Sequence, residues 1–231
     1  MHDRESAFQH TRRRFVCAFP ALGTAAVLTS APLFGQEKEE EEVSTNEDLM
    51  REHGILKRVL LAYDEIIRRI RANKDFPPQA VTDGATIIRK FIEEYHEKLE
   101  EDHLFPRFRK AGKLVSLVVT LLKQHQAGRS VTERVLATAS SLKTQDDRNR
   151  LASDLEAFVR MYAPHEARED TVLFPELHKI VSPHEYDALG EQFESIERNT
   201  FGGDGFDIYV DKVAALEKQL EIYDLNQFTP K

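Results

Sequence analysis

An eleven-residue motif that occurs twice in the chain constrains its fold more than any other feature. Residues 96–106 read HEKLEEDHLFP and residues 165–175 read HEAREDTVLFP, so six of the eleven positions are identical. Each copy has a glutamate four residues after its first histidine and ends in Leu-Phe-Pro. On an α-helix, residues four apart lie on the same face, about 6 Å apart along the axis. Each copy therefore predicts a helix that presents one imidazole and one carboxylate together.

The composition favours helices over sheets. The chain has 231 residues, of which 41% are hydrophobic and 31% charged, with no tryptophan, 10 glycines and 9 prolines. Leucine, glutamate, lysine, arginine and alanine are abundant, and these residues favour helix. The length suffices for one ordinary domain with attachments. We therefore predict an all-α fold.

Four amphipathic stretches predict the core of this fold. Apolar residues recur at helical spacing over approximately residues 44–73, 79–105, 113–142 and 145–180. Because the connections are short, we predict an antiparallel four-helix bundle over residues 46–180. Ser44, with Glu47 three residues later, predicts a capped start to the first helix. Pro106 is expected to bend or end the second helix, and Pro164 to kink the fourth.

Residues 181–231 predict a C-terminal helical extension packed on the bundle. Ser182 and Pro183 have the N-cap and first-turn character of a helix start. Gly202, Gly203 and Gly205 then indicate a turn before a last amphipathic segment, residues 206–222.

The N-terminal residues predict an export signal. Arg12, Arg13 and Arg14 precede a mostly apolar run over residues 15–34, which resembles a twin-arginine signal sequence. We predict a signal peptide over residues 1–35, an acidic linker over residues 36–45 and a periplasmic or cell-envelope location. An uncleaved membrane anchor and an unexported start are the alternatives, and the anchor would be the protein's only contact with a membrane. The single cysteine, Cys17, supports neither a disulfide nor a thiolate metal site.

The acidic charge argues against nucleic acid as a partner. The chain has a formal charge of −8, and residues 1–35 carry +2, which leaves −10 for the remainder. A strongly acidic protein is a poor ligand for a phosphate backbone.

Histidines fall on the apolar stripe of all four predicted helices. A single buried histidine is usually a hydrogen-bonded core residue. Four imidazoles and two carboxylates buried without a counter-charge would be very costly, however, so the set indicates a metal site. If both carboxylates bridge two ions, each ion receives two nitrogens and two oxygens, which leaves positions open on octahedral iron or manganese and does not exclude zinc. The candidate ligands are His53, His96, Glu100, His125, His165 and Glu169.

This pattern resembles the hemerythrin-like (HHE cation-binding) domains over about residues 46–180. The resemblance implies a four-helix bundle with a non-haem di-iron centre, held by the same six residues, with Glu100 and Glu169 bridging. Such domains bind dioxygen or nitric oxide, or sense oxygen or iron. Oxygen-carrying members have two histidines four apart on the third helix, whereas Leu121 and Arg129 flank His125 here. The set is closer to that of the di-iron repair-of-iron-centres proteins, which act in nitrosative stress.

Three classes of function remain open from the sequence. The first is a module that binds or senses dioxygen or nitric oxide. The second is an oxidoreductase acting on peroxide, nitric oxide or ferrous iron, and the third is a metal store or structural protein.

Several residues near the motif are expected to play lesser roles. Glu97 could supply a further ligand, but a surface carboxylate is the favoured interpretation. His103 is expected to support the site or the core rather than bind metal. Tyr63, Tyr95 and Tyr162 are expected to pack in the core, and Tyr95 or Tyr162 could donate a hydrogen bond to a ligand.

Overall fold

The structure is a computed structural model that describes residues 43–230. Within this range all regular secondary structure is helical, which confirms the predicted all-α class. The predicted signal peptide and residues 36–42 of the predicted linker lie outside the described residues. None of the helices from residue 43 onward combines the length and apolar character needed to cross a membrane.

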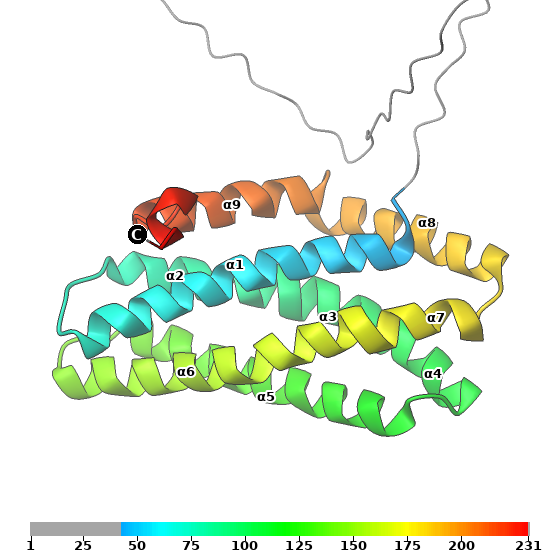
Figure 1. Cartoon of the computed structure of the whole chain (residues 1–231), viewed down its shortest axis with the longest axis horizontal. Helices are drawn as coiled ribbons and strands as arrows, with labels where there is room; N and C mark the ends of the chain where they lie inside the picture. The colour runs from blue at the N-terminus through cyan, green and yellow to red at the C-terminus, as the bar shows by residue number, and fades with distance from the viewer. Residues whose placement is uncertain (1–42, 231) are drawn as a thin grey trace, which may run out of the picture. The chain divides into compact units, whose positions relative to one another are not determined.

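Four helical columns form the bundle, and π-helical segments (η) interrupt two of them. Column one, α1, packs along column four, and column three packs against columns two and four, as Figure 1 shows. The columns are, in order, α1 (Thr45–Arg71); α2 (Pro78–Ile87), η1 (Ile88–His96), α3 (Glu97–Leu99), η2 (Glu100–Leu104) and α4 (Phe105–Ala111); α5 (Val115–Ala139); and α6 (Gln145–Arg168), η3 (Glu169–Leu173) and α7 (Phe174–Ile180).

Local capping explains where several columns begin and end. The Ser44 hydroxyl accepts a hydrogen bond from the Glu47 amide at 3.3 Å, as the sequence predicted. The Thr144 hydroxyl accepts a hydrogen bond from the Asp147 amide in the same way. The Asp147 carboxylate in turn accepts a hydrogen bond from the Thr144 amide, which completes a capping box at the start of α6. Gly112 ends α4 with a φ of 65°, a left-handed conformation that glycine adopts without a Cβ clash.

The two motif copies widen their helices at the same position. In the first copy, the Phe105 amide donates to the Glu100 carbonyl, five residues back. In the second copy, Phe174 donates to Glu169 in the same way. Single π turns of this kind are frequent at functional sites. The repeated sequence therefore builds the same irregular turn twice, and each turn begins at a candidate ligand.

Neither proline of the motif region ends its column. Pro106 lies in the first turn of α4, so the second column continues to Ala111 instead of ending near Phe105. The missing amide of a proline is tolerated in a first turn, because the preceding π segment already rearranges the hydrogen bonds. Pro164 lies inside α6, which continues to Arg168.

The C-terminal helices pack on the bundle as expected. Helices α8 (Pro183–Phe201) and α9 (Gly205–Gln219) contact α1, and α9 also contacts α2, before a short 3₁₀ turn, η4 (Leu225–Phe228). The Tyr209 ring stacks on Phe91 with centroids 4.6 Å apart. Arg58 donates two hydrogen bonds to Glu217, at 2.8 and 2.6 Å, which ties α1 to α9.

Candidate metal centre

The six candidate ligands come together inside the bundle. Each of the four columns contributes one histidine, and columns two and four each add one glutamate. All six side chains are at most 4% exposed. A set of titratable groups this deeply buried is uncommon unless the groups are paired or bind a metal.

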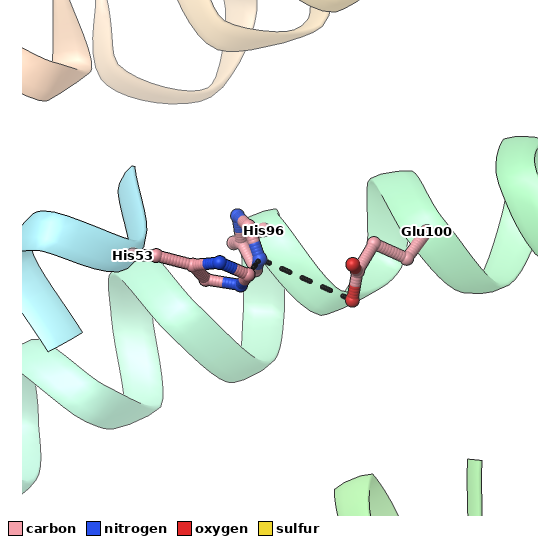
Figure 2. Close-up of side chains that lie close together, drawn as sticks. All are labelled: His53, His96 and Glu100. Atoms are coloured by element: carbon pink, nitrogen blue, oxygen red, sulfur yellow. Dashed lines mark hydrogen bonds and ion pairs between the residues drawn. The ribbon is translucent and has the colours of Figure 1, made fainter. Parts of the chain in front are cut away.

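The histidines form two pairs that the sequence did not specify. His53 Nε2 lies 3.0 Å from His96 Nε2, and we call these two residues the first pair. Figure 2 shows their rings pointing toward one another, with Glu100 one turn further along the second column. His125 Nε2 lies 3.3 Å from His165 Nε2, and these form the second pair.

Each glutamate reaches one histidine of each pair. Glu100 Oε2 lies 3.9 Å from His96 Nε2 and 3.4 Å from His125 Nε2. Glu169 Oε2 lies 3.5 Å from His53 Nε2 and 3.0 Å from His165 Nε2. His53, His96 and Glu100 form one group able to hold a cation, and the remaining three ligands form another. Two carboxylates placed between two pairs of nitrogens have the arrangement that a dinuclear metal site requires.

The carboxylate oxygens themselves indicate that a cation belongs here. Glu100 and Glu169 are 0% exposed, and none of their four oxygens forms a hydrogen bond. A buried carboxyl group without a hydrogen-bond partner is disfavoured, and His96 is the one imidazole among the six ligands whose pKa is raised. Positive ions between the two pairs would remove this cost, so the residues fit a metal centre.

Every ligand histidine forms a hydrogen bond at Nδ1 that orients its ring. His96 Nδ1 contacts Glu52 Oε2 at 2.7 Å, and His165 Nδ1 contacts the side-chain amide oxygen of Gln124, Oε1, at 2.9 Å. The other two contacts are His53 with Asp170 at 2.7 Å and His125 with Glu101 at 3.1 Å. An oxygen acceptor at Nδ1 fixes the tautomer that leaves Nε2 free to bind a metal.

The repeat explains half of these partners. The residue after each motif glutamate orients a histidine of a neighbouring column, because Glu101 follows Glu100 and Asp170 follows Glu169. The phenylalanine of each Leu-Phe-Pro covers the same histidine: Phe105 stacks on His125, and Phe174 stacks on His53, both at 5.5 Å between centroids. Each motif copy therefore supplies ligands from its own column and also orients and covers a ligand histidine of an adjacent column.

Burial holds three of the imidazoles in the neutral form that binds metals. It lowers the pKa of His53 to about 4, although Asp170 opposes the shift. Burial and the charge of His96 lower the pKa of His165 to about 3, and burial also lowers the pKa of His125. Burial alone would lower the pKa of His96, but Glu100 and Glu52 outweigh it and raise that pKa to about 9.

The motif carboxyls shift in the opposite direction. Burial and the nearby Glu169 raise the pKa of Glu100 well above its usual value. Burial likewise raises the pKa of Glu169, and His96 opposes the shift. Metal binding would have to displace the protons that these carboxyls retain.

Comparison with known proteins agrees with this geometry. Residues 44–177 match the hemerythrin HHE cation binding domain. The chain belongs to the hemerythrin HHE cation-binding family. Three relatives, one from Mycobacterium bovis and two from strains of Mycobacterium tuberculosis, are each 51% identical over 195 residues, which cover 84% of this chain and 76% of theirs. All three are named as uncharacterised proteins, and no solved structure matches the chain.

Glu97 of this hemerythrin-family protein is not the surface carboxylate that the sequence favoured. It is 1% exposed and accepts a hydrogen bond from the Tyr162 hydroxyl at 2.6 Å. Arg129 lies 2.7 Å from its other oxygen. Glu97 is therefore already paired. The signal that could have revealed its burial is its position directly after His96, beside the apolar stripe.

The other residues that the sequence singled out support the centre indirectly. Tyr95 donates to Glu52, the carboxylate that orients His96, and neither Tyr95 nor Tyr162 donates directly to a ligand. His103 is half-buried against Phe193, with ring centroids 5.6 Å apart, and belongs to no metal-binding group among the described residues.

The four Nδ1 partners were not predicted from the sequence. Two of them, Glu101 and Asp170, could have been found, because both motif copies have an acidic residue after the glutamate. Glu52 and Gln124 precede His53 and His125, but each orients the histidine of a different column. That assignment depends on how the columns pack.

Two glycines provide a matched test of the packing around Tyr162. A Cβ at Gly128 would lie 2.8 Å from Tyr162 Cζ, whereas a Cβ at Gly54 would meet nothing within 4 Å. Gly128→Ala should lower the free energy of unfolding by about 1–3 kcal/mol through overpacking. Gly54→Ala should raise it by about 0.5–1 kcal/mol, because alanine is the better helix former. Urea unfolding of the metal-free variants measures both, and equal effects would contradict the close approach of Tyr162 to α5.

Proposed function

We propose that this hemerythrin-family protein binds two iron ions through His53, His96, Glu100, His125, His165 and Glu169, and that the loaded centre binds dioxygen or nitric oxide. Manganese and zinc are the alternative metals. The observation that supports the proposal best is the position of each glutamate, which reaches a histidine of both pairs. Both carboxylates would bridge the two ions.

The ligand count leaves room for a small exogenous molecule. Each ion would receive two imidazole nitrogens and two carboxylate oxygens, whereas octahedral iron takes about six ligands. Iron would supply the redox chemistry and the affinity for a diatomic ligand. The chain's own residues orient the imidazoles through Nδ1, and the rings of Phe105 and Phe174 shield the outer faces of His125 and His53 from water.

One observation favours an oxidoreductase as the second candidate. The Tyr162 hydroxyl is hydrogen-bonded to the buried Glu97, and its ring lies 5.3 Å from the His165 ring between centroids. A phenol and a carboxylate beside the second pair could hold or move a proton during turnover. Peroxide, nitric oxide and ferrous iron are the candidate substrates.

The proposed location is the periplasm or the cell envelope. Support comes from Arg12–Arg14 and the apolar run over residues 15–34. An N-terminal anchor is the alternative. Recovery of the protein from the periplasm with a new N-terminus near residue 36 would support export with cleavage, and a cytosolic protein with an intact N-terminus would contradict it.

Metal content and optical spectra of the purified protein test the function. We expect two irons per chain and an absorption spectrum that changes on exposure to dioxygen or nitric oxide. Catalytic consumption of peroxide, nitric oxide or ferrous iron would select the oxidoreductase. A protein that holds no metal, or a single zinc with an unresponsive spectrum, would contradict both functions.

A further inference from the structure

The burial of the centre raises the question of how a cation reaches it. All six candidate ligands are at most 4% exposed. Two clusters, each with two carboxylates and one basic residue, join a ligand histidine to a partly exposed basic side chain. In each, the basic residue follows a ligand histidine by four positions. We call them the Lys57 cluster (Lys57, Glu166, Asp170) and the Arg129 cluster (Arg129, Glu97, Glu101).

The Arg129 cluster is closed by short contacts. Arg129 Nη2 lies 2.7 Å from Glu97 Oε2 and 2.8 Å from Glu101 Oε1. Tyr162 occupies the remaining oxygen of Glu97 at 2.6 Å. A guanidinium that contacts two carboxylates is held rigidly. A metal cation would have to break all of these contacts to pass.

The Lys57 cluster is held loosely. Lys57 Nζ lies 3.8 Å from Glu166 Oε1 and 3.4 Å from Asp170 Oδ2, and its side chain is 51% exposed. Glu166 is only 3% exposed, and its Oε2 forms no hydrogen bond. Glu97 Oε2 in the Arg129 cluster also forms none, but it lies 2.7 Å from Arg129 Nη2. A buried carboxylate oxygen with no partner is costly. A flexible ammonium at the surface is also readily displaced. The cluster therefore holds two carboxylates beside an ammonium that a metal cation could replace.

The Lys57 cluster lies directly beside the first pair. Asp170 accepts the hydrogen bond of His53 Nδ1 at 2.7 Å. Glu166 follows His165 in the chain and lies close enough to His96 for their charges to interact. Lys57 lies on α1, Glu166 on α6 and Asp170 on η3, so a cation bound by the two carboxylates would be one side chain away from His53.

We propose that Glu166 and Asp170 form the site at which a divalent cation first binds on its way to the centre, where it displaces the ammonium of Lys57. This inference rests on the proposed metal function. It concerns only the rate and route of uptake, so the two can fail separately.

Stopped-flow mixing of the metal-free full-length chain with Co²⁺ tests the route, with cobalt absorbance as the probe. Clefts lined by one sign of charge typically raise the on-rates of ions by ten-fold or more. Glu166→Gln should therefore slow uptake about ten-fold. Its final stoichiometry should remain two ions per chain, because Glu166 is not among the six ligands.

The two basic residues provide matched controls at the surface. Lys57→Gln should speed uptake, because it removes the competing ammonium. Arg129→Gln should leave the rate near that of the wild type. If Glu166→Gln does not fold, the uptake rates of Lys57→Gln and Arg129→Gln test the route by themselves. A wild-type rate in Lys57→Gln, a wild-type rate in folded Glu166→Gln, or a larger acceleration in Arg129→Gln than in Lys57→Gln would overturn the route while leaving the metal function intact. A wild-type chain that takes up no cobalt would overturn both.

Discussion

Glu100→Ala and Glu169→Ala are each expected to reduce the metal content from two ions per chain to at most one. Each carboxylate lies within 3.9 Å of a histidine of both pairs, so its removal takes a ligand from both ions at once. The loss should exceed that from any residue outside the six, because replacing a residue that only orients a ligand costs about 10–100-fold in affinity. Metal analysis after loading and desalting measures the effect.

His103→Ala is the matched control for this experiment. His103 lies in the same motif copy as Glu100, but its ring packs against Phe193 and belongs to no metal-binding group among the described residues. The variant should retain two ions per chain. Two ions retained by either glutamate variant would show that the glutamates do not bridge.

Helical periodicity predicted the columns well because it is a local property. Leu49, Phe91, Leu121 and Leu155 recur at helical spacing in the four predicted stretches, and all four are at most 2% exposed. The six ligands could be selected for the same reason, since a histidine on an apolar stripe must face the core. Column ends were less accurate. The third column, expected over residues 113–142, spans Val115–Ala139.

The relations between columns could not be predicted from spacing. The pairing of His53 with His96 depends on which columns are neighbours and on their relative heights. The burial of Glu97 depends on Tyr162, which lies 65 residues away and fits only because Gly128 has no side chain. The π turns that begin at Glu100 and Glu169 were not predicted either, because helical periodicity assumes a regular α-helix.

The metal-free double variant Glu100→Gln/Glu169→Gln is expected to be more stable than metal-free wild type at pH 8, although it should bind no metal pair. The carboxylates are fully buried without hydrogen bonds, and their pKa values are raised in the fold. A neutral amide removes the cost of keeping an acidic group buried at a pH above the pKa that it has in the unfolded chain. The gain should be at least about 2 kcal/mol. This corresponds to a melting temperature about 4–8 °C higher for a chain of this size.

The raised pKa values of the two carboxyls determine how the stability difference between variant and wild type changes with pH. A carboxyl whose pKa is raised in the fold contributes its full stability below its unfolded pKa, and that stability is lost as pH rises through the folded pKa. The difference between variant and wild type should therefore be small near pH 5 and grow toward pH 8. Thermal unfolding of both proteins in the presence of a chelator measures it.

Metal should reverse the order of the two proteins. At a free concentration 100 times the Kd, each bound ion stabilises the wild type by about 2.7 kcal/mol, and the variant should gain nothing comparable. Glu97→Gln is the control of opposite sign: its oxygens are paired with Tyr162 and Arg129, so this variant should be destabilised without metal. A metal-free double variant less stable than wild type at pH 8 would mean that protein groups compensate the two carboxylates. If it is more stable, the metal-free bundle retains two buried acidic groups that destabilise it, and a bound metal pair would offset that cost.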